Sequence, residues 1–241
     1  MTHFTPIVAS AAVAPRAELS DLTGPSDVLV LAPHPDDESL GMGGAIAAAV
    51  QAGHVVHVAV VTDGSRSHPG SKSHPPAVLS ALRKAEVTTA VSILTGGQTT
   101  PIWLGYPDLA APETNAAFAE VAKRLKPVLS KISAIWTTWP GDPHPDHQRV
   151  WRLALWCAAG GSRPRLFGCP VWGRVQQPVE GAGCDGMMRF RTAPYRSLKA
   201  RAIAAHASQM TGLIADAPDG FRMPPDLAHH FVSSDEIFIP A

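Results

Sequence analysis

Short apolar runs alternate with amphipathic stretches along most of the chain, and this alternation is its main structural signal. Four apolar runs have the length and composition of buried strands, at residues 27–32, 54–62, 101–104 and 132–138. The stretches that follow them repeat apolar residues at three- and four-residue steps, which predicts helices, at residues 40–51, 77–94, from about 113, and 146–159. Such alternation is typical of a parallel sheet connected by right-handed crossovers. We therefore predict a single α/β domain, a mostly parallel sheet with helices on both faces.

The two ends of the chain are less regular than its middle. Residues 1–26 are rich in Ala, Pro and Thr, and we expect a frayed N-terminal arm, with the organised domain at 27–241. Beyond Gly160 the pattern weakens. It still predicts a strand, a helix and a last short strand, at residues 165–171, 197–210 and 236–240.

Composition narrows the possible functions and partners. Twenty basic residues balance twenty acidic residues, which does not favour a nucleic-acid binder. Three cysteines are too few for a disulfide framework, and their odd number suits a reducing compartment. A signal peptide would need a Lys or Arg near its start, and none precedes Arg16. No apolar stretch is long enough to span a membrane. We expect a soluble cytoplasmic protein that acts on a small molecule.

Two His-Pro-Asp clusters follow the first and fourth predicted strands, at residues 34–38 (HPDDE) and 144–147 (HPDH). Ligands of such sheets bind beyond the C-terminal ends of the strands. Imidazole and carboxylate groups are the ligands of catalytic zinc sites, which keep one position open for water. One cluster alone could be a turn. Two at matching strand ends predict a metal centre, because so many buried carboxylates without a cation would be costly to desolvate.

The segment 28–44 (VLVLAPHPDDESLGMGG), taken with His144–His147, resembles the PIG-L/LmbE family of zinc-dependent N-acetyl-sugar deacetylases. The segments Arg83–Glu86 and Ala205–Gln209 are also similar to patterns of that family. The likeness extends over residues 27 to 210, or nearly so. It implies a Rossmann-like fold, one divalent metal, and hydrolysis of the amide C–N bond of an N-acetylated amino sugar or its conjugate.

The resemblance also implies roles for individual residues. The implied ligands of one Zn²⁺ ion are His34, Asp37 and His147. Asp36 would be the general base that takes a proton from the metal-activated water. His144 would stabilise the oxyanion or donate a proton, and Asp146 beside it would orient it and favour its imidazolium form.

Four further residues are candidates for a place at the site. Arg83 is a substrate contact by the resemblance, or half of an intrahelical pair with Glu86 three residues on. Asp108 follows the third predicted strand and could accept a hydrogen bond from a sugar hydroxyl. Glu38 is interpreted as an acidic residue in the first turn of a helix, where the helix dipole favours it. His206 lies either at the rim of the pocket or on a helix surface.

The sequence thus predicts a metal-dependent hydrolase that removes the acetyl group from an N-acetylglucosamine-type sugar or its conjugate. Two alternatives stay open. One is a metal-dependent amide hydrolase acting on a non-sugar N-acyl substrate. The other is a non-catalytic sugar- or metal-binding relative, although a binding protein would not need Asp36 or His144. We expect the irregular residues 160–241 to determine which sugar and aglycone are bound.

Overall fold

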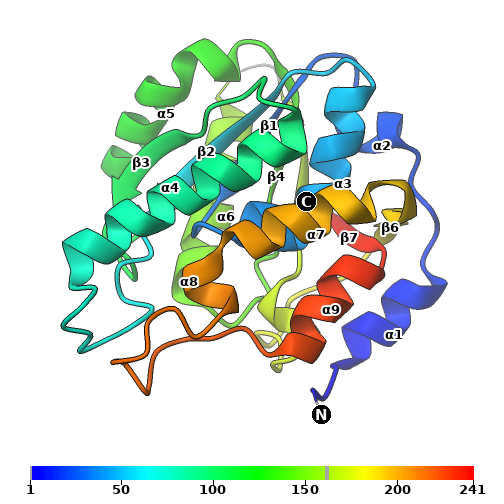
Figure 1. The fold of residues 1–241 in the computed structure, drawn as a ribbon. Helices are drawn as coiled ribbons and strands as arrows, with labels where there is room; N and C mark the ends of the chain where they lie inside the picture. Colours follow the sequence, from blue (N-terminus) through cyan, green and yellow to red (C-terminus); the bar gives the residue numbers. More distant parts are fainter. Residues whose placement is uncertain (1, 161–162) are drawn as a thin grey trace.

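A seven-stranded sheet forms the centre of the molecule in this computed structural model, which describes residues 2–160 and 163–241 (Figure 1). The strands are β1 (Asp27–Ala32), β2 (Val56–Thr62), β3 (Ile102–Tyr106), β4 (Ile132–Thr138), β5 (Arg165–Cys169), β6 (Met188–Phe190) and β7 (Glu236–Pro240). Their order is β3-β2-β1-β4-β5-β7-β6. The first five are parallel, and β7 is antiparallel to both of its neighbours.

Helices cover both faces of the sheet, as the sequence predicts. The larger helices are α3 (Asp37–Gln51), α4 (Pro76–Thr95), α5 (Asn115–Leu129), α6 (Pro145–Ala159) and α7 (Arg196–Ala205). The shorter ones are α1 (Pro6–Val13), α2 (Leu19–Thr23), α8 (Ala207–Met210) and α9 (Pro225–Ser233), with 3₁₀ turns at Trp172–Arg174 and Ala193–Tyr195. In Figure 1, α4 and α7 cross the near face of the sheet, while α5 and α6 lie behind it. The mostly parallel α/β fold is therefore confirmed.

The central strands are apolar throughout because both of their faces are buried. Val28 and Val30 point into one core cluster, which residues of α3, α4 and α7 complete. Leu29 and Leu31 point into the opposite cluster, which residues of α5 and α6 complete. Side chains alternate between the two faces of a strand, so each face needs its own apolar set.

The sheet reverses its order of growth between β1 and β4. The chain adds β2 and β3 on one side of β1, and β4 and β5 on the other side. The segments that leave β1 and β4 therefore diverge, which opens a crevice at the carboxyl ends of these two strands. Both His-Pro-Asp clusters lie at that crevice, at the end of β1 and at the start of α6.

The N-terminal segment differs from the expected frayed arm. It forms α1 and α2, and both helices pack on the body of the protein. Leu22 is fully buried and its carbonyl accepts a hydrogen bond from Trp136 Nε1 at 3.0 Å. The expectation of a frayed arm was wrong. The segment packs on parts of the core that are distant in sequence, and its own sequence pattern does not indicate these contacts. The domain boundary at residue 27 stays a prediction. Residue 1 of the predicted arm and residues 161 and 162 of the predicted domain lie outside the described residues.

Truncating Leu22 tests whether this segment contributes to stability. Leu22→Ala should lower the free energy of unfolding by about 2–5 kcal/mol, the usual cost of emptying a buried leucine site. Val13 is 85% exposed, so Val13→Ala is the control and should change stability by less than about 0.5 kcal/mol. Urea denaturation measures both variants. Equal, small effects would mean that the segment is dispensable.

The C-terminal third also departs from the prediction. The helix expected at 197–210 is two helices, α7 and α8, which meet at His206. Strand β6 and helix α9 had no predicted counterpart, since the two elements are only three and nine residues long. Within residues 2–160 and 163–241, no helix has both the length and the apolar character needed to cross a membrane.

Candidate active site

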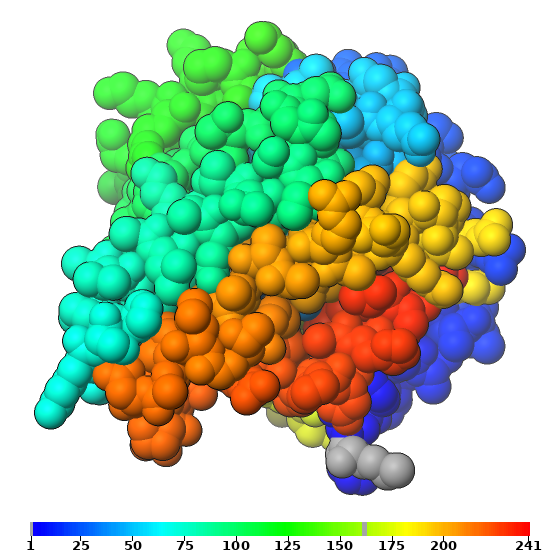
Figure 2. Space-filling model, viewed as in Figure 1, coloured from blue at the N-terminus to red at the C-terminus, as the bar shows by residue number. Residues whose placement is uncertain are grey.

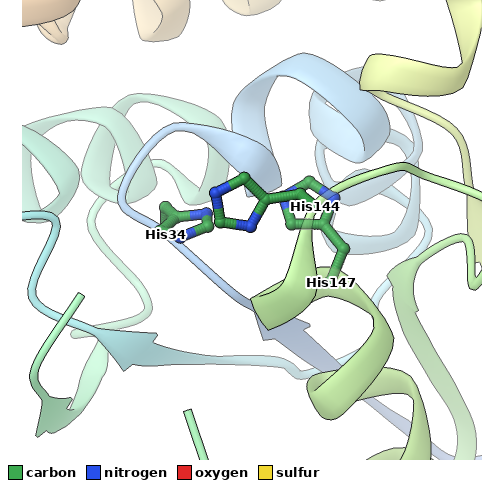
Figure 3. A group of neighbouring side chains, drawn as sticks. All are labelled: His34, His144 and His147. Atoms are coloured by element: carbon green, nitrogen blue, oxygen red, sulfur yellow. The ribbon is translucent and has the colours of Figure 1, made fainter. Parts of the chain in front are cut away.

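Three histidine rings meet at the crevice between β1 and β4. His34 comes from the segment after β1, and His144 and His147 come from the start of α6 (Figure 3). The ring centroids of His34 lie 4.6 Å from His144 and 5.4 Å from His147, and those of His144 and His147 lie 5.1 Å apart. The two clusters that the sequence singles out therefore form one site.

Asp37 lies between two of these rings. Its Oδ2 is 3.2 Å from His34 Nδ1 and 3.3 Å from His147 Nε2. His147 Nε2 is buried, and no hydrogen bond reaches it in the described part of the chain. Burial would lower the pKa of His147, but the charge of Asp37 and a hydrogen bond to Asp142 raise it to about 9. Ligand atoms of His34, His144 and His147 lie within 4.8 Å of one another, and imidazole and carboxylate groups are the donor types that a divalent cation uses in proteins.

Asp142 holds His147 in position, and the sequence analysis missed it. Its Oδ2 lies 2.9 Å from His147 Nδ1 and accepts the backbone N–H of Val171 at 2.9 Å. Its Oδ1 accepts the N–H of Gly173 at 2.7 Å. A carboxylate on one ring nitrogen fixes the proton there and leaves the other nitrogen free as a ligand, as is usual for metal-binding histidines. The only sequence signal was an acidic residue in the loop that carries His144.

Asp36 lies beside these donors in an unusual backbone conformation. Its φ is 129°, a region that residues other than glycine rarely adopt. Its Oδ2 accepts a hydrogen bond from Arg83 Nη2 at 3.1 Å. Burial raises the pKa of Asp36 to about 6, although the charge of Arg83 opposes this shift. The side chain lines the central cavity, so it can meet a substrate there.

Arg83 supports the Asp36 loop from the side of α4. Its guanidinium donates to the carbonyl of Pro35 as well as to the Asp36 carboxylate. The predicted alternative, an intrahelical pair with Glu86, is wrong. Glu86 instead accepts hydrogen bonds from the backbone N–H and the hydroxyl of Ser208, both at 2.7 Å. Arg83 is only 3% exposed but borders the cavity, and its contact with substrate stays a prediction.

The Asp146 carboxylate turns away from His144. It accepts the backbone N–H groups of Leu109 at 2.8 Å and Ala111 at 3.1 Å. The nearest histidine nitrogen to it is His34 Nε2, at 3.3 Å. The expectation that Asp146 orients His144 through its carboxylate is therefore wrong. Backbone amides of a loop engage that carboxylate, and the spacing of residues in the sequence does not reveal them. Any catalytic role of Asp146 stays a prediction.

His144 is held as a neutral hydrogen-bond donor. Its Nδ1 accepts the backbone N–H of Asp146 at 3.2 Å, in the N-cap arrangement of α6. A neutral ring that accepts at Nδ1 carries its proton at Nε2. Burial, together with the charges of His34 and His147, lowers the pKa of His144 to about 3, which favours the neutral ring over the expected imidazolium.

Asp108 lies on the other side of His34. Its Oδ1 is 3.4 Å from His34 Nε2, and its Oδ2 accepts the backbone N–H of Arg66 at 3.0 Å. Asp108 and Asp146 thus flank the same ring nitrogen, a position suited to acceptors that orient a metal-binding imidazole. Asp108 borders the cavity, and its proposed contact with a sugar hydroxyl stays a prediction.

A cavity of about 320 Å³ opens above these residues, a size typical of small-molecule sites. Asp36, Asp37 and His144 are among the side chains that line it, whereas His147 is fully buried. The C-terminal third supplies a large part of the wall, namely Trp172, Gln176, Gln209 and Phe221. The rings of Trp172 and Phe221 meet edge to face, with their centroids 5.5 Å apart. The irregular C-terminal residues are thus in a position to contact the substrate.

Comparison with known proteins gives sequence relatives for this chain. A family model described as GlcNAc-PI de-N-acetylase matches residues 29–158. A 1D-myo-inositol 2-acetamido-2-deoxy-alpha-D-glucopyranoside deacetylase from Kineococcus radiotolerans is 30% identical over 187 residues, which are 65% of this chain and 52% of that protein. A mycothiol S-conjugate amidase from Streptomyces coelicolor is 26% identical over 183 residues, 66% of this chain and 60% of that protein. The chain therefore spans little more than half the length of these curated relatives.

Solved structures share the fold over most of the chain. The N,N'-diacetylchitobiose deacetylase from Pyrococcus horikoshii has a TM-score of 0.68 at 21% identity, covering 93% of this chain and 87% of that one. The 4-carboxy-2-hydroxymuconate hydratase from Pseudomonas putida has a TM-score of 0.64 at 17% identity, covering 85% and 82%. The same fold thus supports more than one chemistry. Because the matching family model spans more than half of the sequence and includes both His-Pro-Asp clusters, the chain belongs to the PIG-L family.

Proposed function

We propose that this protein is a zinc-dependent deacetylase that removes the acetyl group from an N-acetylglucosamine-type sugar conjugate. The observation that carries the proposal is the meeting of His34, Asp37 and His147 beside a cavity that His34, Asp36 and Asp37 line. Family membership and the names of the two curated relatives support the same chemistry. That this chain itself acts on an N-acetylglucosamine-type conjugate is part of the proposal.

The metal ligands in this proposal are His34, Asp37 and His147. The unpartnered, buried Nε2 of His147 and the carboxylate beside it are the donor types that zinc prefers. When bound, a divalent cation supplies a Lewis acid that activates water and polarises the acyl oxygen. Asp142 holds a proton on Nδ1 of His147, so that Nε2 is the nitrogen that would face the cation. Asp108 and Asp146 lie 3.4 and 3.3 Å from His34 Nε2, which leaves Nδ1 as the nitrogen of His34 that would face it.

Asp36 acts as the general base in this mechanism. It accepts a proton from the water that attacks the acyl carbon, and it returns that proton to the amine nitrogen as the C–N bond breaks. Arg83 restrains the carboxylate at 3.1 Å and so limits its rotation. Acetate and a free amino sugar leave, which balances the hydrolysis.

His144 stabilises the negative charge that develops on the acyl oxygen. As a neutral ring with its proton at Nε2, it donates a hydrogen bond to that oxygen without first having to be protonated. This replaces the imidazolium role expected from the sequence. Trp172 and Phe221 offer an apolar wall for the sugar ring, and Asp108 offers an acceptor for a hydroxyl.

Acetate release from a panel of substrates tests the proposal. N-acetylglucosamine, N,N'-diacetylchitobiose and an N-acetylglucosaminyl-inositol should be compared with N-acylated amines that lack a sugar. We expect release from at least one sugar conjugate, about one bound zinc per chain, loss of activity on chelation and recovery with Zn²⁺. Full turnover by metal-free protein in EDTA would overturn the metal assignment. Turnover of the non-sugar amides alone would support the alternative amide hydrolase, and sugar binding without acetate release would support the non-catalytic alternative.

We also propose a cytoplasmic location. The three cysteines, Cys157, Cys169 and Cys184, are all free thiols, which suits a reducing compartment. Fractionation of cells that make the protein at native levels tests this, and recovery in an extracellular or membrane fraction would contradict it.

A further inference from the structure

The backbone of Asp36 needs external support to keep its conformation. At φ 129° it lies in a region that L-residues avoid, and such strain persists only where the surrounding structure holds it. The hydrogen bond from Arg83 restrains the side chain of Asp36. It does not restrain the Asp36 backbone N–H, whose partner is a side chain two residues further along the chain.

That partner is Glu38. The Asp36 N–H donates to Glu38 Oε2 at 3.0 Å, and the side chain of Glu38 is fully buried. The other carboxylate oxygen, Oε1, accepts the Ser39 hydroxyl at 2.6 Å and lies 3.0 Å from His206 Nε2. Glu38 therefore does more than face a helix dipole, since both of its oxygens are engaged around the catalytic loop.

His206 is the imidazole that faces this buried carboxylate. It is fully buried at the junction of α7 and α8, far from Glu38 in sequence and beyond the stretch that the family model matches. Because a carboxylate can only accept, Nε2 carries the proton that the two groups share. Its Nδ1 is buried and has no hydrogen-bond partner among the described residues. Among the described residues, the polar contacts of the His206 ring are therefore those of Nε2 with Glu38 and the adjacent Ser39.

Helix α3, which carries Glu38, packs directly against α7, which ends next to His206. In Figure 2 the orange C-terminal segment also lies against the teal helix α4 on the near face of the molecule. The ring of His206 and the carboxylate of Glu38 lie beneath the surface, with no exposed area on either side chain. Because a buried carboxylate is costly to desolvate, the N–H of His206 acts together with the Ser39 hydroxyl and the Asp36 N–H to hold the Glu38 carboxylate in place.

We propose that Glu38 and His206 are a pair of positioning residues that holds the strained backbone of Asp36, so that the C-terminal third completes the catalytic loop. The proposal rests on the proposed role of Asp36 as general base. Without the N–H of His206, Oε1 of Glu38 keeps only the Ser39 hydroxyl. The carboxylate is then free to rotate, and its other oxygen moves away from the Asp36 N–H. Asp36 then relaxes away from the attacking water while the metal ligands stay in place.

Two substitutions at one position separate this role from simple packing. His206→Gln keeps an amide N–H near the place of Nε2, whereas His206→Leu keeps bulk and removes the donor. We expect His206→Leu to lower kcat by about 10–100-fold, the scale for a misplacement of about 1 Å, with KM and zinc content unchanged. His206→Gln should keep kcat within about threefold of the natural protein. If the Gln variant is as impaired as the Leu variant, or if zinc is lost, the proposal is wrong.

A double-mutant cycle with Asp36→Asn gives the decisive measurement. If His206 acts through Asp36, adding His206→Leu to Asp36→Asn should lower kcat by less than about twofold further. An equal loss in both backgrounds would overturn the positioning role. Should His206→Leu fail to fold, His206→Asn replaces it, since its shorter amide does not reach Glu38. A near-normal kcat of Asp36→Asn alone would instead refute the proposed base, an outcome that does not involve His206.

Discussion

Asp36→Asn is expected to lower kcat by about 10²–10⁴-fold, the usual contribution of a general base, while about one zinc stays bound per chain. The amide is nearly isosteric, and its oxygen can still accept the hydrogen bond from Arg83. Asparagine also tolerates positive φ better than most residues, so the loop should keep its conformation. Steady-state kinetics together with metal analysis of the same sample measure both effects.

The adjacent carboxylate provides the matched comparison. Asp37→Ala should lose zinc, because it removes the oxygen that lies between His34 Nδ1 and His147 Nε2. Its activity should return only partly at high zinc concentration. If Asp36→Asn empties the site and Asp37→Ala stays loaded, the roles of the two aspartates are reversed.

His147→Ala is expected to strip zinc from the protein and so abolish activity. The substitution removes the buried Nε2 and leaves the Asp142 carboxylate without the ring that it orients. His144→Ala is the matched comparison on the same helix start and should keep zinc. It should lower kcat by about 10²–10³-fold, as loss of an oxyanion-hole donor does, with little change in KM.

Zinc content and kinetics measured on purified protein distinguish the two histidines. A zinc-loaded His147→Ala variant would mean that the wrong histidine is assigned to the metal. A His144→Ala variant with near-normal kcat would remove that residue from the mechanism without affecting the ligand set.

The sequence by itself was enough to predict the α/β fold and to single out the two clusters that meet at the site. Both depend on local features. Apolar periodicity marks β1, β2, β4 and the helices between them, and their alternation implies a parallel sheet. The clusters at residues 34–38 and 144–147 contain metal-binding side chains, and each follows a strand. The type of each side chain, and the number of residues between it and the end of a strand, can both be taken from the local sequence.

Only the tertiary structure decided which groups act on one another. Pairing of β1 with β4 brings the two clusters together. Long-range contacts turn the Asp146 carboxylate toward loop amides, and the backbone N–H groups of Val171 and Gly173 hold the Asp142 carboxylate that faces His147. Another long-range contact brings His206 to Glu38 across 168 positions of sequence. The burial of Leu22 against Trp136 is another such contact. Local spacing carries no signal for these contacts, because the partner of a polar group is set by where the folded chain leaves a buried donor or acceptor to be satisfied.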